Sequence, residues 1–117
     1  MPSTAHHAIL FASLAPYLAL SAYDGWLHEK ARRVPRAEQV LHALLALSAI
    51  ALIFGLFTDR PWFAWPGLAV FVPAAIADER GFHGLLEPRE RRLHHVAYAC
   101  FAGFIGVAAW LGALRWP

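Results

Sequence analysis

Apolar residues run along the chain in four long stretches that contain no lysine or arginine. The stretches cover, approximately, residues 8–27, 39–58, 61–79 and 93–114. Each is close to the roughly 20 residues that an α-helix needs to cross about 30 Å of hydrocarbon. The pattern predicts an all-α fold, an integral membrane four-helix bundle that forms a single transmembrane domain over residues 1–117. Pro16 and Pro73 fall inside two of the stretches, where membrane helices tolerate proline.

Composition supports a membrane protein over a soluble one. Of the 117 residues, 59% are hydrophobic and 15% are charged, whereas a soluble domain carries about 25% charged residues. A soluble fold of this length cannot bury so much apolar surface, and disordered chains are far more polar. The single cysteine excludes a disulfide framework and a cysteine-based metal site. The first stretch lacks a preceding basic segment, so we expect a helix there rather than a cleaved signal peptide.

The ten basic residues are concentrated between the first and second stretches and between the third and fourth. The eight in these two segments are Lys30, Arg32, Arg33, Arg36, Arg80, Arg89, Arg91 and Arg92. Only Arg60 and Arg115 lie on the other side. By the positive-inside rule, both basic loops face the cytoplasm and both termini face outwards. We therefore expect an integral protein of a bacterial inner membrane.

A short motif recurs in the two basic segments. Glu-x-x-Leu-His occupies 38–42 and again 90–94, and a proline precedes each copy, at Pro35 and Pro88. Proline is well suited to the first turn of a helix, because the N–H that it lacks has no partner there. The repeat predicts two helical hairpins in pseudo-repeat, related by an axis along the membrane normal.

The main chemical signal is a carboxylate placed four residues before a histidine. It occurs once for each predicted helix, in the pairs Asp24/His28, Glu38/His42, Glu79/His83 and Glu90/His94. Residues four apart share one face of a helix, and random placement would give about half of one such pair in this length. All four pairs fall at the predicted cytoplasmic ends. We therefore expect these eight residues to converge there and to bind two divalent metal ions about 3.5–4 Å apart.

The predicted helix directions sort these residues into two layers. Asp24, His42, Glu79 and His94 form the deeper layer, and the other four members form the shallower one. Ionisable groups within membrane helices are costly and usually have partners in the bundle interior. Asp78 is an alternative to Glu79, because a kink at Pro73 would change the helical phase. His95 is a further imidazole that binds the metal, supports a ligand or contacts a lipid headgroup.

The same pairs have a structural interpretation. A carboxylate and a histidine at a membrane interface can form a hydrogen bond or interact favourably with a helix end. The arginines are first of all a signal of topology, and an anionic lipid headgroup could also bind them.

The donor set indicates which metals to expect. Histidines and carboxylates without cysteine favour iron, with zinc and manganese as alternatives. The arrangement resembles soluble di-iron bundles, which combine glutamates with Glu-x-x-His motifs. The spacing here is four residues rather than three, so the chain is not assigned to that family. No residue is assigned to an organic cofactor, and no catalytic residue is singled out.

The sequence supports several functions. The first is an oxidoreductase of the hydroxylase type with a dinuclear non-haem centre, acting on a membrane lipid or another hydrophobic small molecule, with an unidentified redox partner. The alternatives are a small divalent-metal or drug transporter, a zinc-dependent membrane hydrolase, and a haem-binding or anchor subunit. Small multidrug-resistance pumps are similar in size and work as dimers, so a homodimer is one of the expected assemblies. Nucleic acid is not an expected partner, because the basic residues follow the membrane rule.

Overall fold

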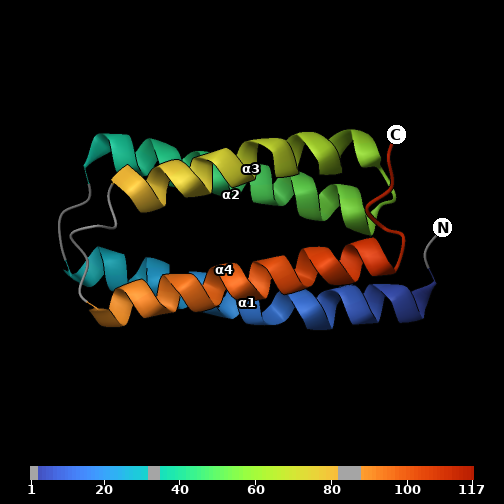
Figure 1. Cartoon of the computed structure of the whole chain (residues 1–117), viewed down its shortest axis with the longest axis horizontal. Helices are drawn as coiled ribbons and strands as arrows, with labels where there is room; N and C mark the ends of the chain where they lie inside the picture. Colours follow the sequence, from blue (N-terminus) through green and yellow to red (C-terminus); the bar gives the residue numbers. More distant parts are fainter. Residues whose placement is uncertain (1–2, 32–34, 82–87) are drawn as a thin grey trace. The chain divides into compact units, whose positions relative to one another are not determined.

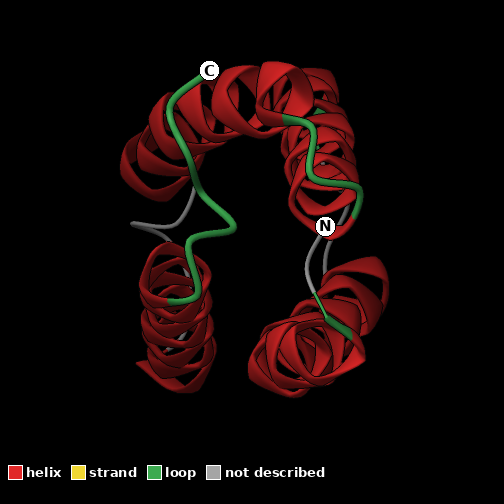
Figure 2. Ribbon diagram, turned by 90° about the vertical axis from the view of Figure 1, so that its right-hand side faces the viewer, coloured by secondary structure: helices red, strands yellow, loops and turns green. Residues whose placement is uncertain are grey.

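The computed structural model describes residues 3–31, 35–81 and 88–117. These residues form four α-helices and no strand, which confirms the predicted all-α class (Figures 1 and 2). The helices are α1 (Thr4–Ala31), α2 (Arg36–Phe57), α3 (Pro61–Gly81) and α4 (Pro88–Trp110). Pro16 lies inside α1, and Pro66 and Pro73 lie inside α3.

Three of the helices are long and apolar enough to cross a membrane. The qualifying segments are Thr4–Leu27, Arg36–Phe57 and Pro88–Trp110, in α1, α2 and α4. α3 is 21 residues long but is not among them, because prolines and tryptophans at its beginning and charged residues at its end lower its hydropathy. That α3 also crosses the membrane, as the sequence pattern predicts, stays a prediction, and so does the orientation of the termini.

The chain divides into two compact units. One contains α1 and α4, and the other contains α2, α3 and the C-terminal residues 113–117. Each unit therefore pairs one helix of the first predicted hairpin with one helix of the second.

In the α2/α3 unit the two helix backbones approach each other closely. A Cβ atom added to Gly55 would lie 2.3 Å from the backbone nitrogen of Ala64, and one added to Gly67 would lie 2.6 Å from that of Leu52. Neither position can accept a side chain unless the helices separate. Small residues at helix interfaces allow this kind of packing in membranes. The two glycines thus fix the antiparallel contact of α2 with α3.

The buried positions of α3 recur every three or four residues, apart from the adjacent pair Ala74 and Ala75. They are Ala64, Gly67, Phe71, Ala74, Ala75 and Asp78. This spacing is that of one helix face, and the facing positions of α2 include Ser48, Leu52 and Gly55. The face of α3 that packs against α2 therefore begins with Ala64 and Gly67 and ends at Asp78. This places the Asp78 carboxylate beside α2.

The α1/α4 unit is also antiparallel, and it is built on larger side chains. The buried residues of α4 are His94, Ala97, Phe101, Phe104 and Ala108, again three or four positions apart. The ring of Tyr17 on α1 lies 5.2 Å from that of Phe101, measured between centroids. His94 is the first of these buried residues in the sequence. It lies near the N-terminal end of α4, beside the C-terminal part of α1.

The C-terminal residues pack against the α2/α3 unit at the end opposite to Asp78. Trp65 donates a hydrogen bond from Nε1 to the carbonyl oxygen of Arg115 at 2.6 Å, and its ring lies 5.2 Å from that of Trp116. The Arg115 guanidinium also forms an ion pair with Asp59. Gly112, whose φ is +70°, provides the left-handed turn that commonly ends a helix such as α4.

Candidate metal site

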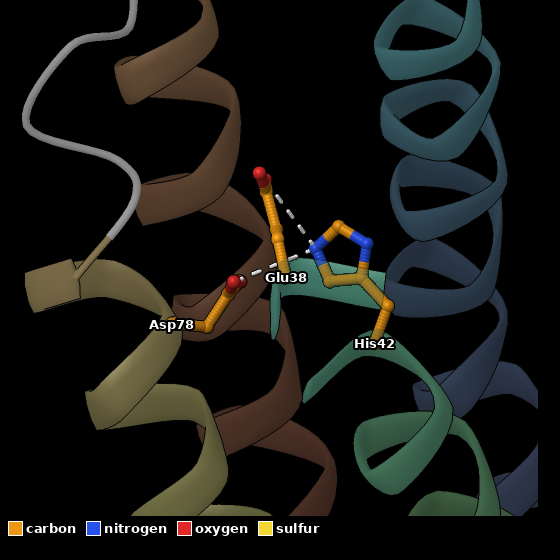
Figure 3. A group of neighbouring side chains, drawn as sticks. All are labelled: Glu38, His42 and Asp78. Carbon is orange, nitrogen blue, oxygen red and sulfur yellow. Dashed lines mark ion pairs between the residues drawn. The ribbon is translucent and has the colours of Figure 1, made fainter. Parts of the chain in front are cut away.

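Three ionisable side chains meet where α2 begins and α3 ends. Glu38 and His42 come from the first two turns of α2, and Asp78 comes from the last turn of α3 (Figure 3). The His42 Nε2 atom lies 3.5 Å from Asp78 Oδ1 and 3.8 Å from Glu38 Oε1. Each residue offers one ligand atom, and these three atoms all lie within 4.8 Å of one another. We call this group the Glu38–His42–Asp78 site.

Burial distinguishes the carboxylates of this site from the imidazole. Glu38 is 0% exposed and Asp78 is 2% exposed, whereas the His42 side chain is 37% exposed. Carboxylates away from water are costly unless positive charge or hydrogen-bond donors compensate them. His42 supplies one such neighbour, and a cation between the three groups would supply another.

The spacing suits one metal ion after small side-chain rotations. Nitrogen and oxygen ligands bind zinc at about 2.0–2.2 Å, so two ligands of one such ion lie at most about 4.4 Å apart. The two distances from His42 Nε2, 3.5 Å and 3.8 Å, are within this limit. The three groups could therefore hold one metal ion.

The α1/α4 unit contains a second carboxylate–histidine contact. His94 Nε2 and Asp24 Oδ1 are 2.6 Å apart and form a hydrogen bond. The His94 side chain is 4% exposed, and that of Asp24 is 23% exposed. This contact joins two of the residues that the sequence assigned to the deeper layer.

The eight predicted site residues are distributed over both units. Glu38 and His42 lie together with Asp78, and Asp24 lies together with His94. Glu79 and Glu90 are half-buried, and His95 is exposed. The side chain of His28 and the whole of His83 lie outside the described residues. The convergence of all eight in one centre stays a prediction.

The sequence pattern of a carboxylate four residues before a histidine favours Glu79, which lies four residues before His83, and leaves Asp78 as the alternative. The structure places Asp78, and not Glu79, in the site. The buried face of α3, which passes through Ala64, Gly67, Phe71 and Ala74, continues to Asp78 and not to Glu79. The small residues of that face were visible in the sequence, and their phase would have pointed to Asp78.

Two exposed arginines flank the site in sequence. Arg36 lies two residues before Glu38, and Arg80 lies two residues after Asp78. Both are at the helix ends that the positive-inside rule assigns to the cytoplasm. The site is therefore near one end of α2 rather than in its middle.

No family model, curated protein or solved structure matches this chain.

Proposed function

We propose that this protein is an integral membrane metalloprotein that binds a divalent ion at the Glu38–His42–Asp78 site. The observation that carries the proposal is the pairing of two buried carboxylates with one partly exposed imidazole. One of the two helices that supply these groups, α2, is apolar enough to cross a membrane. Ionisable residues in such helices commonly mark functional sites.

A divalent cation compensates these groups better than a proton does. A protonated His42 would carry one positive charge against the two negative charges of Glu38 and Asp78. A divalent ion balances both carboxylates and binds the imidazole in its neutral form. The buried position of the carboxylates thus favours metal binding over a simple ion pair.

One nitrogen and two oxygen donors suit iron, zinc and manganese. We propose iron as the metal that this site binds. Three protein ligands leave positions at the metal open to a reacting molecule, which is typical of catalytic rather than structural sites. The exposed part of His42 marks the side from which that molecule could approach.

The reaction that we propose is hydroxylation of a lipid-like or other hydrophobic substrate. One oxygen atom of O2 enters a C–H bond, and the other leaves as water. An external reductant, the redox partner, supplies two electrons, and two protons are taken up. Bound iron would supply the oxygen-activating chemistry. Glu38, His42 and Asp78 hold the ion, and the apolar helix surfaces admit the substrate from the membrane.

Comparing neighbouring carboxylates tests the site most sharply. Purified protein in detergent is stripped of metal and titrated with Mn²⁺ by calorimetry, as wild type, Asp78→Asn and Glu79→Gln. Both variants remove one negative charge from adjacent positions in α3. We expect Asp78→Asn to weaken binding at this site by at least tenfold and Glu79→Gln to bind as the wild type does. Equal binding by wild type and Asp78→Asn would overturn the proposal.

A further inference from the structure

The α1/α4 unit repeats the polar arrangement of the α2/α3 unit. In both units, a histidine in the second turn of one helix approaches an aspartate near the end of its partner. His42 faces Asp78 at 3.5 Å, and His94 faces Asp24 at 2.6 Å. The histidines lie in matching copies of Glu-x-x-Leu-His, so the resemblance extends from the sequence to the contacts.

The third donor of the first site also has a counterpart. Glu38 precedes His42 by four residues on α2, and its Oε1 lies 3.8 Å from His42 Nε2. Glu90 precedes His94 by the same four residues on α4 and is half-buried. Residues four apart lie one above the other on a helix, so a rotation of the Glu90 side chain can bring its carboxylate to His94. Both units then offer two carboxylates and one imidazole.

The second group is not a copy in every respect. Counted back from the Leu27-His28 and Phe82-His83 dipeptides that follow them, Asp24 and Asp78 are one residue out of register. Asp78 instead reaches the histidine through the buried face that contains Ala74. The equivalence of the two aspartates therefore rests on their contacts and not on their position in the repeat.

We propose that Asp24, His94 and Glu90 form a second divalent-cation site, which binds its ion within the α1/α4 unit. The inference rests on the proposed metal binding at the Glu38–His42–Asp78 site. Two ligands of one ion at bond lengths of about 2.0–2.2 Å lie roughly 3 Å apart. The 2.6 Å contact of His94 with Asp24 thus needs only a small separation to admit the ion. The ion replaces the hydrogen bond, and Glu90 supplies the third ligand.

Counting the ions bound by the 117-residue chain tests this inference. Metal-free protein in detergent is equilibrated with Mn²⁺, and bound manganese per chain is measured after dialysis. The wild type should bind two ions. Asp24→Asn, which preserves shape, and His94→Ala should each bind one. His42→Ala should also bind one, and the His42→Ala/His94→Ala double variant none. His6→Ala, on α1 at the other end of the unit, should bind two, and circular dichroism verifies that each variant remains helical.

The number of bound ions distinguishes failure of the second site from failure of the proposed function. If the wild type binds one ion, which His42→Ala removes and Asp24→Asn retains, the second site is wrong and the proposed function stands. If the wild type binds no ion, the proposed function fails as well. If Asp24→Asn or His94→Ala alone releases both ions, the α1/α4 unit does not hold an ion of its own and the inference is overturned.

Discussion

Asp24 and His94 are separated by 70 positions in the sequence, yet their side chains form a hydrogen bond of 2.6 Å. Asp24 lies near the end of α1, and His94 lies in the second turn of α4. Seven residues earlier in α1 and seven later in α4, the rings of Tyr17 and Phe101 are also in contact, so the two contacts together place α1 and α4 antiparallel and in a defined register. The same geometry brings Asp78 of α3 to His42 of α2.

Replacing Gly55 or Gly67 with alanine should destabilise the α2/α3 unit. The added Cβ would meet backbone atoms at 2.3 or 2.6 Å, and a backbone cannot rotate away as a side chain can. Overpacking of this kind costs about 1–3 kcal/mol. Thermal unfolding in detergent, followed by circular dichroism, measures the loss.

Gly103 and Gly106 of α4 provide the matched controls. An added Cβ at either position would meet nothing within 4 Å. Alanine there should leave the midpoint unchanged or raise it slightly, since alanine is the better helix former. An equal loss of stability at all four glycines would contradict the close α2/α3 contact.

Removing metal should lower the thermal stability of the protein. A ligand that binds only the folded state stabilises it by about 2.7 kcal/mol when present at one hundred times its dissociation constant. Adding Mn²⁺ to metal-free wild type should therefore raise the unfolding midpoint. Glu38→Gln should show a smaller rise, because it removes one buried carboxylate of the site. A midpoint that is insensitive to metal in the wild type would count against a folded-state site.

Trp65→Phe should weaken the attachment of the C-terminal residues. The substitution keeps an aromatic ring beside Trp116 but removes the hydrogen bond to the Arg115 carbonyl, at a cost of about 0.5–1.5 kcal/mol. Carboxypeptidase should then trim the C-terminus faster than in wild type. Trp62→Phe is the control, because Trp62 is largely exposed; equal rates in both variants would show that the Trp65 hydrogen bond does not hold the tail.

The predicted orientation can be tested in intact cells. With Cys100 replaced by serine, Arg91→Cys should resist a membrane-impermeant thiol reagent added from the periplasmic side. Arg60→Cys should react, since the positive-inside rule places Arg60 on the opposite face. Labelling of Arg91→Cys without permeabilising the inner membrane would reverse the topology.

Hydropathy was sufficient to predict the helices, because long apolar stretches in lipid satisfy their backbone hydrogen bonds only as helices or closed barrels. The pattern could not predict which helices pair. The α2/α3 contact depends on two glycines that allow backbones to touch, and only the structure shows that Gly55 and Gly67 face a partner helix. Glu79 is preferred to Asp78 when the four-residue spacing to His83 is given more weight than the phase of the small residues of α3. Glu38 and His42 were simpler to identify, because their spacing of four residues lies within one helix.

We propose above that Glu38, His42 and Asp78 bind a metal ion in the folded protein. X-ray absorption spectroscopy of wild type and His42→Ala, each purified without added metal, tests this binding directly. We expect an iron edge in the wild type, with nitrogen and oxygen atoms and no sulfur bound to the metal. The His42→Ala spectrum should lose the imidazole contribution of this site. A wild-type protein without stoichiometric metal, or a first shell unchanged by His42→Ala, would contradict the claim.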